Sequence, residues 1–529
     1  MLFCPYGGAK RPGARFLALL LLTGLLAGPG CARRTPRPDT LVVLGDMDVE
    51  GLDPHLSGAV WQTLNVLLNL YEPLVTADPQ MSLAPALAVA WSNPDERTWV
   101  FQLRQGVSFH TGGVLDAEDV VFSLLRARDH ERSALRASLA GVEDVRALPG
   151  GRVQIKTARP DAVLAARLKD VLIASRRFLQ QNGEGAAQAT SCGTGPYRLV
   201  ARAAGATVDL ERFPAYWRGP APIARARFLA RRYGDPDVPR YAPPPARLLF
   251  AAVPGTPKYE QALAENAAHF APSLSVAYLS WDLQHLETPR VTLPGGGKGN
   301  PFLDPRVREA IARALSLEEV RALRRNEGFS VAQLFPRVVF GFDPTLPLPS
   351  HDVEEAKRLM ARTPFASGFE VELDVREVMS SYESVIERDL LPLGIRVKTR
   401  RRADRDFFET LSSGGSSFYV LRFSCRSGDA QEFFDKWVHS KDGERRLGGF
   451  NFSYDRNPVE GLDAEIDEAR REMDVTRRRV KLQQVTRRVM EARLALPLLN
   501  EKDHTMTSAD VVWTPRADTF RILYDARFR

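Results

Sequence analysis

The stretch TWVFQLRQGVSFHTGGVLDAEDVVFSLLRAR, residues Thr98 to Arg128, decides how the rest of this 529-residue chain is interpreted. In its first part, apolar Trp99, Phe101 and Leu103 alternate with residues that face the other way, which predicts a half-buried strand. A Gln-Gly pair then turns the chain, and Val107 to Phe109 is predicted to return as a short second strand. The first half of the stretch therefore predicts a β-hairpin.

The second half of the stretch predicts a helix. Asp116 stands where an N-cap residue is expected, and the acidic Glu118 and Asp119 fall in the first turn, where the helix dipole favours negative charge. Apolar residues recur behind the cap at helical spacing, namely Val120, Val121, Leu124 and Leu125. A hairpin followed by a capped helix occurs in many folds, so the pattern alone does not indicate a function.

The identities of the residues are more specific. The run Leu-Arg-x-Gly-Val-x-Phe-His-x-Gly at 103–112 and the run Asp-Val-Val-Phe-Ser at 119–123 resemble the signature of the family 5 extracellular solute-binding proteins. Members of that family are bacterial lipoproteins that capture peptides, nickel complexes and related solutes for ABC importers. The match has no gap, and its visible departure is Val114, where the family often has a proline.

Further landmarks of the same family follow in order along the chain. They are Leu-Asp-Pro-His at 52–55, Leu-Tyr-Glu-Pro-Leu at 70–74, Gly-Thr-Gly-Pro-Tyr at 193–197, Asp-Pro-Arg-Val-Arg-Glu-Ala-Ile at 304–311 and the Asn-Phe-Ser-Tyr run that begins at Asn451. The resemblance implies an α/β fold of the two-lobed periplasmic-binding-protein (flytrap) type, with an extra subdomain in the first lobe and mixed sheets flanked by helices. Gly193 and Gly195 are expected to take backbone angles that other residues resist.

The same landmarks predict the domain organisation. Residues 1–30 are expected to be a signal peptide and 31–39 a tether; residues 40–275 form lobe I, with the extra subdomain at about 76–190, residues 276–495 form lobe II, and 496–529 return to lobe I. The crossings between lobes are expected near Val276 to Asp282 and near Leu496 to Lys502. In the second lobe, a strand at Phe369 to Val375, a helix at Tyr382 to Leu391 and a strand at Arg396 to Thr399 suggest a parallel crossover unit.

The N-terminus has the features of an export signal. Three basic residues precede the apolar run Phe16 to Ala27, which is too short to span a bilayer but fits the core of a signal peptide. Small residues then lead to Cys31, which resembles a lipobox cysteine although Gly28 replaces the usual leucine. The sequence predicts lipid attachment at Cys31 and a location on the periplasmic or cell-surface side of a bacterial membrane, with simple secretion as the alternative.

The composition argues against other protein classes. The net charge of +7 comes with 61 Arg and 11 Lys spread along the chain between acidic residues, so a nucleic-acid-binding face is not favoured. Cys192 and Cys425 are the only cysteines of the body, and we expect two separate buried residues rather than a disulfide framework.

Catalytic motifs are absent from the sequence. It contains no His-Glu-x-x-His and no Gly-x-Ser-x-Gly, and no two of its eight histidines lie three or four residues apart. His110 is expected to be a structural hydrogen-bonding residue. The sequence therefore predicts a protein that is not an enzyme, with no cofactor and no metal site; a secreted hydrolase is a disfavoured third reading.

The resemblance also implies where a ligand binds. In peptide-binding members a strand ends in Trp-x-x-Asp, shortly before an acidic-Pro pair and an aromatic, and that Asp holds the ammonium group of the peptide. Aligning Asp429 and Phe433 with the latter part places Arg426 at the ammonium-binding position and Phe423 at the tryptophan. Ala430 replaces the proline.

An arginine at that position would repel an ammonium group, because an unpaired charge in a closed cleft is costly. Two alternatives are that Arg426 points to solvent, or that the register slips and Asp429 takes over. The residues predicted to contact the ligand are Arg426, Phe423, Ser424, Asp429 and Trp61, with Phe423 and Trp61 as apolar walls.

The sequence thus predicts the extracytoplasmic solute-binding component of an ABC importer, which captures a peptide-like or other small polar solute between two closing lobes. Its partners would be the solute, ABC permease subunits and the membrane through the lipid anchor, with no nucleic acid and a monomeric state. The alternative is a divergent member that acts as a sensor or docking protein without transport.

Overall fold

The computed structural model describes residues 39–45, 49, 51–57, 61–203, 206–242, 246–252, 257–323 and 328–529. The predicted signal peptide, Cys31 and the tether up to residue 38 lie outside the described residues, as does the side chain of Trp61. Among the helices of the described ranges, none combines the length and the apolar character that a membrane span requires.

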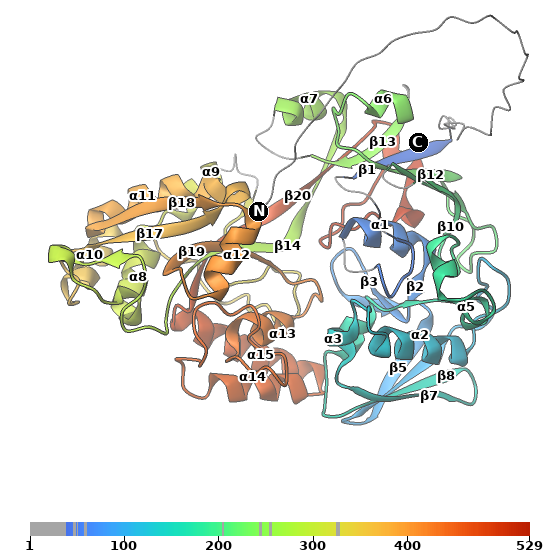
Figure 1. The fold of residues 1–529 in the computed structure, drawn as a ribbon, viewed down its shortest axis with the longest axis horizontal. Coiled ribbons are helices and arrows are strands. Elements are labelled where there is room, and N and C mark those ends of the chain that lie inside the picture. The colour runs from blue at the N-terminus through green and yellow to red at the C-terminus, as the bar shows by residue number, and fades with distance from the viewer. Residues whose placement is uncertain are drawn as a thin grey trace, which may run out of the picture. The chain divides into compact units, whose positions relative to one another are not determined.

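A large mixed sheet of twelve strands organises most of the chain (Figure 1). Its main path runs in the order β10 (Tyr197–Ala203), β11 (Thr207–Arg212), β12 (Arg225–Ala230), β1 (Thr40–Gly45), β13 (Arg247–Ala251), β20 (Ala495–Thr507), β14 (Ala267–Trp281), β19 (Phe418–Ser424), β17 (Phe369–Arg376) and β15 (Val291–Thr292). β16 (Gly328–Phe329) pairs with β20, and β18 (Ile395–Arg402) pairs with β17. Parallel pairs join β1 to β12 and β13, and β17 to β18 and β19.

The two long strands β14 and β20 pair antiparallel and contain both of the segments predicted to cross between lobes. Their register shifts between Pro272 and Val276, where a proline cannot donate to the ladder. The side-chain amide of Asn500 donates to the carbonyls of Ser273 and Ser275, at 2.8 Å in each case. A side chain thus provides the donors for two strand carbonyls beside the irregularity.

The stretch Thr98 to Arg128 folds only partly as expected. β6 (Thr98–Leu103) is the predicted strand, and it lies in a four-stranded antiparallel sheet in the order β5 (Ala88–Asp95), β6, β8 (Arg152–Thr157) and β7 (Val142–Leu148). The predicted second strand at Val107 to Phe109 is wrong, because β5 and β8 already occupy both edges of β6. Only a single bridge joins Ser108 to Val114.

The helix α2 (Ala117–Asp129) follows as predicted. The Asp116 carboxylate accepts from the Asp119 amide at 3.0 Å, and the Asp119 carboxylate accepts from the Asp116 amide at 3.1 Å, which is a capping box with aspartate in both roles. Val120 and Leu124 are buried and help to join α2 to the four-stranded sheet in one apolar core (Figure 1).

Smaller elements complete the first part of the chain, together with one strand pair near the C-terminus. Two-stranded pairs join β2 (Glu72–Pro73) to β9 (Leu172–Ile173), β3 (Val75–Ala77) to β4 (Leu83–Pro85), and β21 (Val511–Val512) to β22 (Arg527–Phe528). The helices are α1 (Trp61–Leu70), α3 (Arg136–Leu139), α4 (Leu164–Leu168), α5 (Arg176–Asn182), α6 (Val238–Tyr241) and α7 (Pro257–Glu265).

The predicted parallel crossover is confirmed in the second part of the chain. β17, α11 (Glu383–Leu390) and β18 follow one another, and the two strands pair parallel from Phe369 opposite Ile395 onward. The other helices here are α8 (Pro305–Ala314), α9 (Leu317–Leu323), α10 (Val353–Ala361), α12 (Asp404–Ser412), α13 (Ala430–Phe433), α14 (Leu462–Arg471) and α15 (Val475–Glu491). Strands β14, β17 and β19 and several of these helices share the largest apolar cluster.

Segments that lie far apart in the sequence meet at Glu72. Its buried carboxylate accepts hydrogen bonds from Thr194 Oγ1 at 2.8 Å, Tyr216 Oη at 2.8 Å and Trp217 Nε1 at 3.0 Å. Burial raises the pKa of Glu72, and these three donors act in the opposite direction. The Arg104 guanidinium lies 3.7 Å from the Trp217 ring centre, which connects the opening stretch to the same group.

The Gly-Thr-Gly-Pro-Tyr turn leads into β10 as predicted, but its glycines have a different role. Neither Gly193 nor Gly195 is among the residues with positive φ, so the expectation about backbone angles is wrong. A Cβ on Gly195 would lie 2.6 Å from the Asn69 carbonyl oxygen, and one on Gly193 would lie 2.2 Å from the Leu70 carbonyl oxygen. Both glycines are needed for close approach to the end of α1.

Candidate functional site

The predicted ligand segment begins at the end of β19, where Ser424 lies opposite Ser275 of β14. A tight turn follows, in which the Gly428 amide donates to the Cys425 carbonyl at 3.0 Å. Gly428 has a φ of 75°, and its carbonyl accepts from the Phe340 amide at 2.8 Å. A glycine suits this left-handed position, which ends the turn before α13.

Arg426 occupies the second position of this turn and is half-buried. Its backbone amide donates to the Ser424 carbonyl at 2.9 Å, and its carbonyl accepts from Lys169 Nζ at 2.7 Å. Within the described part of the chain, its guanidinium makes no hydrogen bond, ion pair or ring contact. The backbone of Arg426 is therefore fixed from both sides, while its charged group has no acceptor among the described residues.

Asp429 has a structural environment. Arg478 of α15 donates to its carboxylate from both terminal nitrogens, at 2.6 and 2.7 Å, and the two side chains are 8% and 6% exposed. The same carboxylate caps α13 by accepting from the Gln431 amide at 3.0 Å. Its two oxygens are thus engaged by a buried arginine and a helix amide.

The other predicted ligand residues lie in different surroundings. Phe423 is buried and contacts the rings of Phe433 and Trp437, each with a centroid distance of 5.2 Å. Ser424 is half-buried at the strand end, directly before the turn. Trp61 begins α1, but its side chain lies outside the described residues, and Cys31 lies outside them altogether. The structure therefore brings Phe423, Ser424, Arg426 and Asp429 together in one segment.

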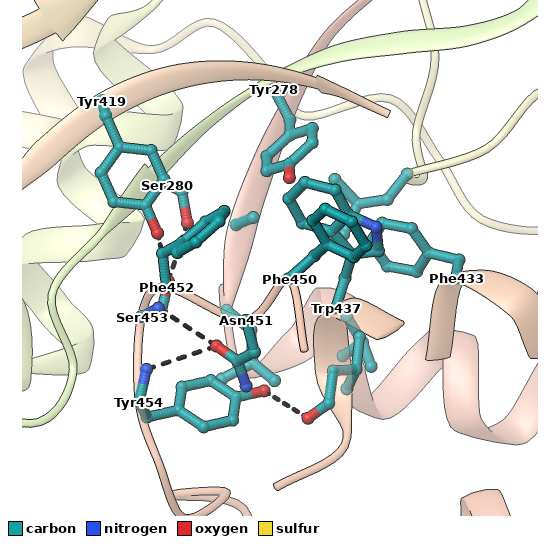
Figure 2. Close-up of a pocket in the computed structure, with 15 residues that line it drawn as sticks. Tyr278, Ser280, Tyr419, Phe433, Trp437, Phe450, Asn451, Phe452, Ser453 and Tyr454 are labelled. Atoms are coloured by element: carbon teal, nitrogen blue, oxygen red, sulfur yellow. Dashed lines mark hydrogen bonds between the residues drawn. The ribbon is translucent and has the colours of Figure 1, made fainter. Parts of the chain in front are cut away.

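The sequence reasoning missed an aromatic pocket (Figure 2), whose residues Phe433 and Trp437 contact the ring of Phe423. Its walls come from β14, β19, the region of α13 and the loop at 450–454, and they include Tyr278, Tyr419, Phe433, Trp437, Phe450 and Phe452. Strand alternation places Tyr278 and Ser280 of β14 on the same face, where they meet Tyr419 and Phe423 of β19. The aromatic residues at 437, 450 and 452 were the available signal, but nothing in the sequence places them beside β14.

A serine organises the polar end of this pocket. Ser453 Oγ lies 3.0 Å from Ser280 Oγ and 2.9 Å from Tyr419 Oη. The Asn451 side-chain oxygen accepts from the backbone amides of Ser453 and Tyr454, at 3.1 and 3.3 Å (Figure 2). These bonds fix the Asn-Phe-Ser-Tyr run that the sequence identified as a family landmark.

The histidines within the landmarks have structural partners. His110 Nε2 lies 2.9 Å from the Gly195 carbonyl and its Nδ1 lies 3.1 Å from Ser191 Oγ, so the expected hydrogen-bonding role is confirmed. His55 Nδ1 accepts from Arg126, which also forms a bidentate pair with Asp53. The ring proton of His55 is thereby assigned to Nε2, which donates to the Leu172 carbonyl at 2.9 Å.

Burial lowers the pKa of both His55 and His110 to about 4. Neither ring is therefore protonated at neutral pH. The described residues contain no cluster of three histidine, cysteine, aspartate or glutamate side chains that could hold a metal ion. Cys192 and Cys425 are both buried and free, which confirms that they are separate residues.

Comparison with known proteins relates this arrangement to a family. Residues 82–445 match the model described as "Bacterial extracellular solute-binding proteins, family 5 Middle". The chain is 23% identical over 491 residues to the dipeptide-binding protein of Escherichia coli, a match that covers 81% of this chain and 86% of that protein.

Solved structures show the same fold. HbpA2 from Haemophilus parasuis aligns with a TM-score of 0.79 at 20% identity, over 93% of this chain and 100% of that chain. The unliganded open form of MppA, a periplasmic murein tripeptide-binding protein, aligns with a TM-score of 0.77 at 17% identity, over 93% and 98%. The predicted fold class, a two-lobed periplasmic-binding-protein fold with mixed sheets flanked by helices, is confirmed.

Proposed function

We propose that this chain, which belongs to family 5 of the bacterial extracellular solute-binding proteins, captures a small polar or peptide-like solute and delivers it to an ABC importer. Family membership supports the binding role, and the relatives include proteins named for dipeptide and oligopeptide binding. Members of the family bind solutes and are not enzymes. The permease subunits of such an importer would be the partners, and the protein would act as a monomer.

The choice of solute rests on the partners that the side chains of Arg426 and Asp429 have in the structure. The guanidinium of Arg426 has no acceptor among the described residues, whereas the carboxylate of Asp429 is held by Arg478. A solute carboxylate or phosphate could accept two parallel hydrogen bonds from a guanidinium, while a peptide ammonium would be repelled. We therefore propose a solute with an anionic or strongly accepting group at this point.

We further propose that the solute is enclosed by two lobes with the boundaries given by the landmarks. Residues 40–275, with an extra subdomain at about 76–190, would form the first lobe, 276–495 the second, and 496–529 would return to the first. Closure over the solute would remove water from Arg426 and strengthen its interaction with an anion. Lipid attachment at Cys31 would hold the protein on the outer side of the membrane.

The experiment begins with mass spectrometry of the solute released from purified full chain, followed by calorimetric titration of that solute. Arg426→Ala should weaken its binding by about 2–5 kcal/mol, the range for losing one partner of a buried charged pair. Arg426→Asp should restore the peptide-type charge and shift the preference toward peptides with a free N-terminus. Arg405→Ala is the control, because Arg405 is exposed and, within the described ranges, its ion pair is with Glu409 of its own helix.

Equal affinity of Arg426→Ala and the wild type for the released solute would refute the role of Arg426. The sensor or docking alternative is tested separately. Co-purification of permease subunits supports transport, whereas solute binding without any permease association would favour the alternative.

A further inference from the structure

The aromatic pocket contains two buried hydrogen-bond donors that have no partner in the described part of the chain. Neither Tyr278 Oη nor Trp437 Nε1 has a hydrogen-bond partner among the described residues. Tyr278 is 3% exposed, and Figure 2 shows its hydroxyl directed toward the rings of Trp437 and Phe450. An unsatisfied buried donor costs free energy, so each of these two groups favours an occupant that carries an acceptor.

The tyrosine hydroxyl groups at the other end of the pocket do have hydrogen-bond partners. Tyr419 Oη is within hydrogen-bond distance of Ser453, and Tyr454 Oη donates to the Val438 carbonyl at 2.7 Å. The unpaired donors are thus confined to the side formed by Tyr278 and Trp437. That side is also the most aromatic part of the wall.

The rings around these donors favour a flat occupant. Tyr278 meets Trp437 edge-on with a centroid distance of 5.8 Å, and Phe450 stacks on Trp437 at 5.4 Å with 18° between the ring planes. Phe450 is 47% exposed, so an occupant that takes its place has to displace a half-buried ring. A planar group that took its place would keep the stacking on Trp437.

The absence of charge in the described lining of the pocket restricts its occupant further. Of the described residues that line the pocket, none carries a charge. An ionic group entering it would lose water without gaining a partner of opposite charge, whereas a neutral acceptor could take the hydroxyl of Tyr278 or the indole N–H of Trp437.

One ring of the proposed ligand segment packs against the wall of the pocket. Phe423, three residues before Arg426, contacts both Phe433 and Trp437 of the pocket wall. We propose that this pocket binds a neutral, planar, acceptor-bearing group, such as an aromatic ring with a carbonyl or an amide. This group would be a second part of the solute whose anionic part meets Arg426, an assignment that rests on the proposed function.

The probe for this pocket is benzamide, a neutral planar acceptor, titrated into the purified full chain by ligand-observed NMR. Benzamidinium has the same shape but a positive charge, and toluene lacks the acceptor. We expect benzamide to bind at least about a hundredfold more tightly than benzamidinium, because the cation would be buried without a partner. Tyr278→Phe should weaken benzamide by about tenfold, equal to about 1.4 kcal/mol, and leave toluene unchanged.

Trp437→Phe should weaken benzamide in the same way. Tyr197→Phe is the matched control, since Tyr197 is a buried tyrosine outside the pocket whose hydroxyl donates to the Ile223 carbonyl at 3.0 Å. It should lower stability without changing benzamide affinity. Tyr278→Phe, by contrast, should not lower the unfolding temperature, because it removes an unpaired hydroxyl.

The proposal is overturned if benzamide does not bind, if benzamidinium binds equally well, or if Tyr278→Phe binds benzamide as tightly as the wild type. The result also separates the pocket from the proposed function. If benzamide binds as expected but the purified protein releases no solute, the pocket proposal stands and the proposed function is refuted. If a released solute depends on Arg426 for binding but Tyr278→Phe has no effect on benzamide, the proposed function stands and the pocket proposal is refuted.

Discussion

Asp429→Asn should destabilise the fold by about 3–5 kcal/mol, because it leaves the charge of Arg478 buried without a partner. Both side chains are less than a tenth exposed, and two bonds of 2.6 and 2.7 Å join them. Asparagine has nearly the same shape and keeps an oxygen for the Gln431 amide, so most of the N-cap of α13 survives. The loss in unfolding free energy therefore measures the charge pair rather than the N-cap.

Two further variants isolate this effect. Arg478→Met removes the stranded guanidinium, so Asp429→Asn combined with Arg478→Met should cost less than the sum of the two single variants, with a coupling energy of about 0.5–3 kcal/mol. Asp404→Asn is the exposed counterpart, because Asp404 pairs with Arg376 at the surface and is 61% exposed. Its cost should stay below about 1 kcal/mol.

The assay is equilibrium urea unfolding at 25 °C and pH 7, followed by circular dichroism and tryptophan fluorescence, with the m-value compared among variants. Solute affinity is measured on the same samples under conditions where each is fully folded. A loss of less than about 1 kcal/mol for Asp429→Asn would refute the buried-pair argument. A large loss of solute affinity in folded Asp429→Asn would instead show that this carboxylate contacts the solute.

The remaining predictions concern pH and the membrane. The pKa of His55 and of His110 is lowered by burial to about 4, below the ordinary 6.5, so the unfolded chain takes up protons first as the pH falls. Stability should be complete above pH 6.5 and fall by up to about 3 kcal/mol per histidine on the way to pH 4; urea midpoints that do not change over this range would contradict it. Cys31→Ala should convert a membrane-associated protein into a soluble exported one, and fractionation that finds the wild type already soluble with another first residue would contradict the lipid anchor.

Local patterns predicted the elements whose causes are local. The N-cap of α2 and the parallel unit of β17 and β18 follow from spacing over a few residues. The returning strand at Val107 to Phe109 was wrong because a strand needs a free edge, and β8, some fifty residues later, had already taken it. No local pattern contains that information.

The candidate site shows the same limit. Alignment with the family signature placed Arg426 at the end of a strand, but it could not show that Arg478, 49 residues after Asp429, engages that carboxylate. Similarly, the donors to Glu72 come from residues 122 to 145 positions away. The roles of such residues depend on which distant side chains reach them, and only the folded chain fixes that.

The charged groups around the Arg426 turn also disfavour a peptide ammonium. Lys169 donates to the carbonyl of the same turn at 2.7 Å, so a second cation lies beside it, with Asp170 at 3.3 Å from that ammonium. The nearby acid Glu432 is already paired, since Lys436 lies 2.6 Å from its carboxylate. A peptide ammonium at this turn would therefore meet cations and no free carboxylate among Asp429 and Glu432. Because Coulomb energies grow as water is excluded, closure would penalise that ligand further and favour an anion by the same physics.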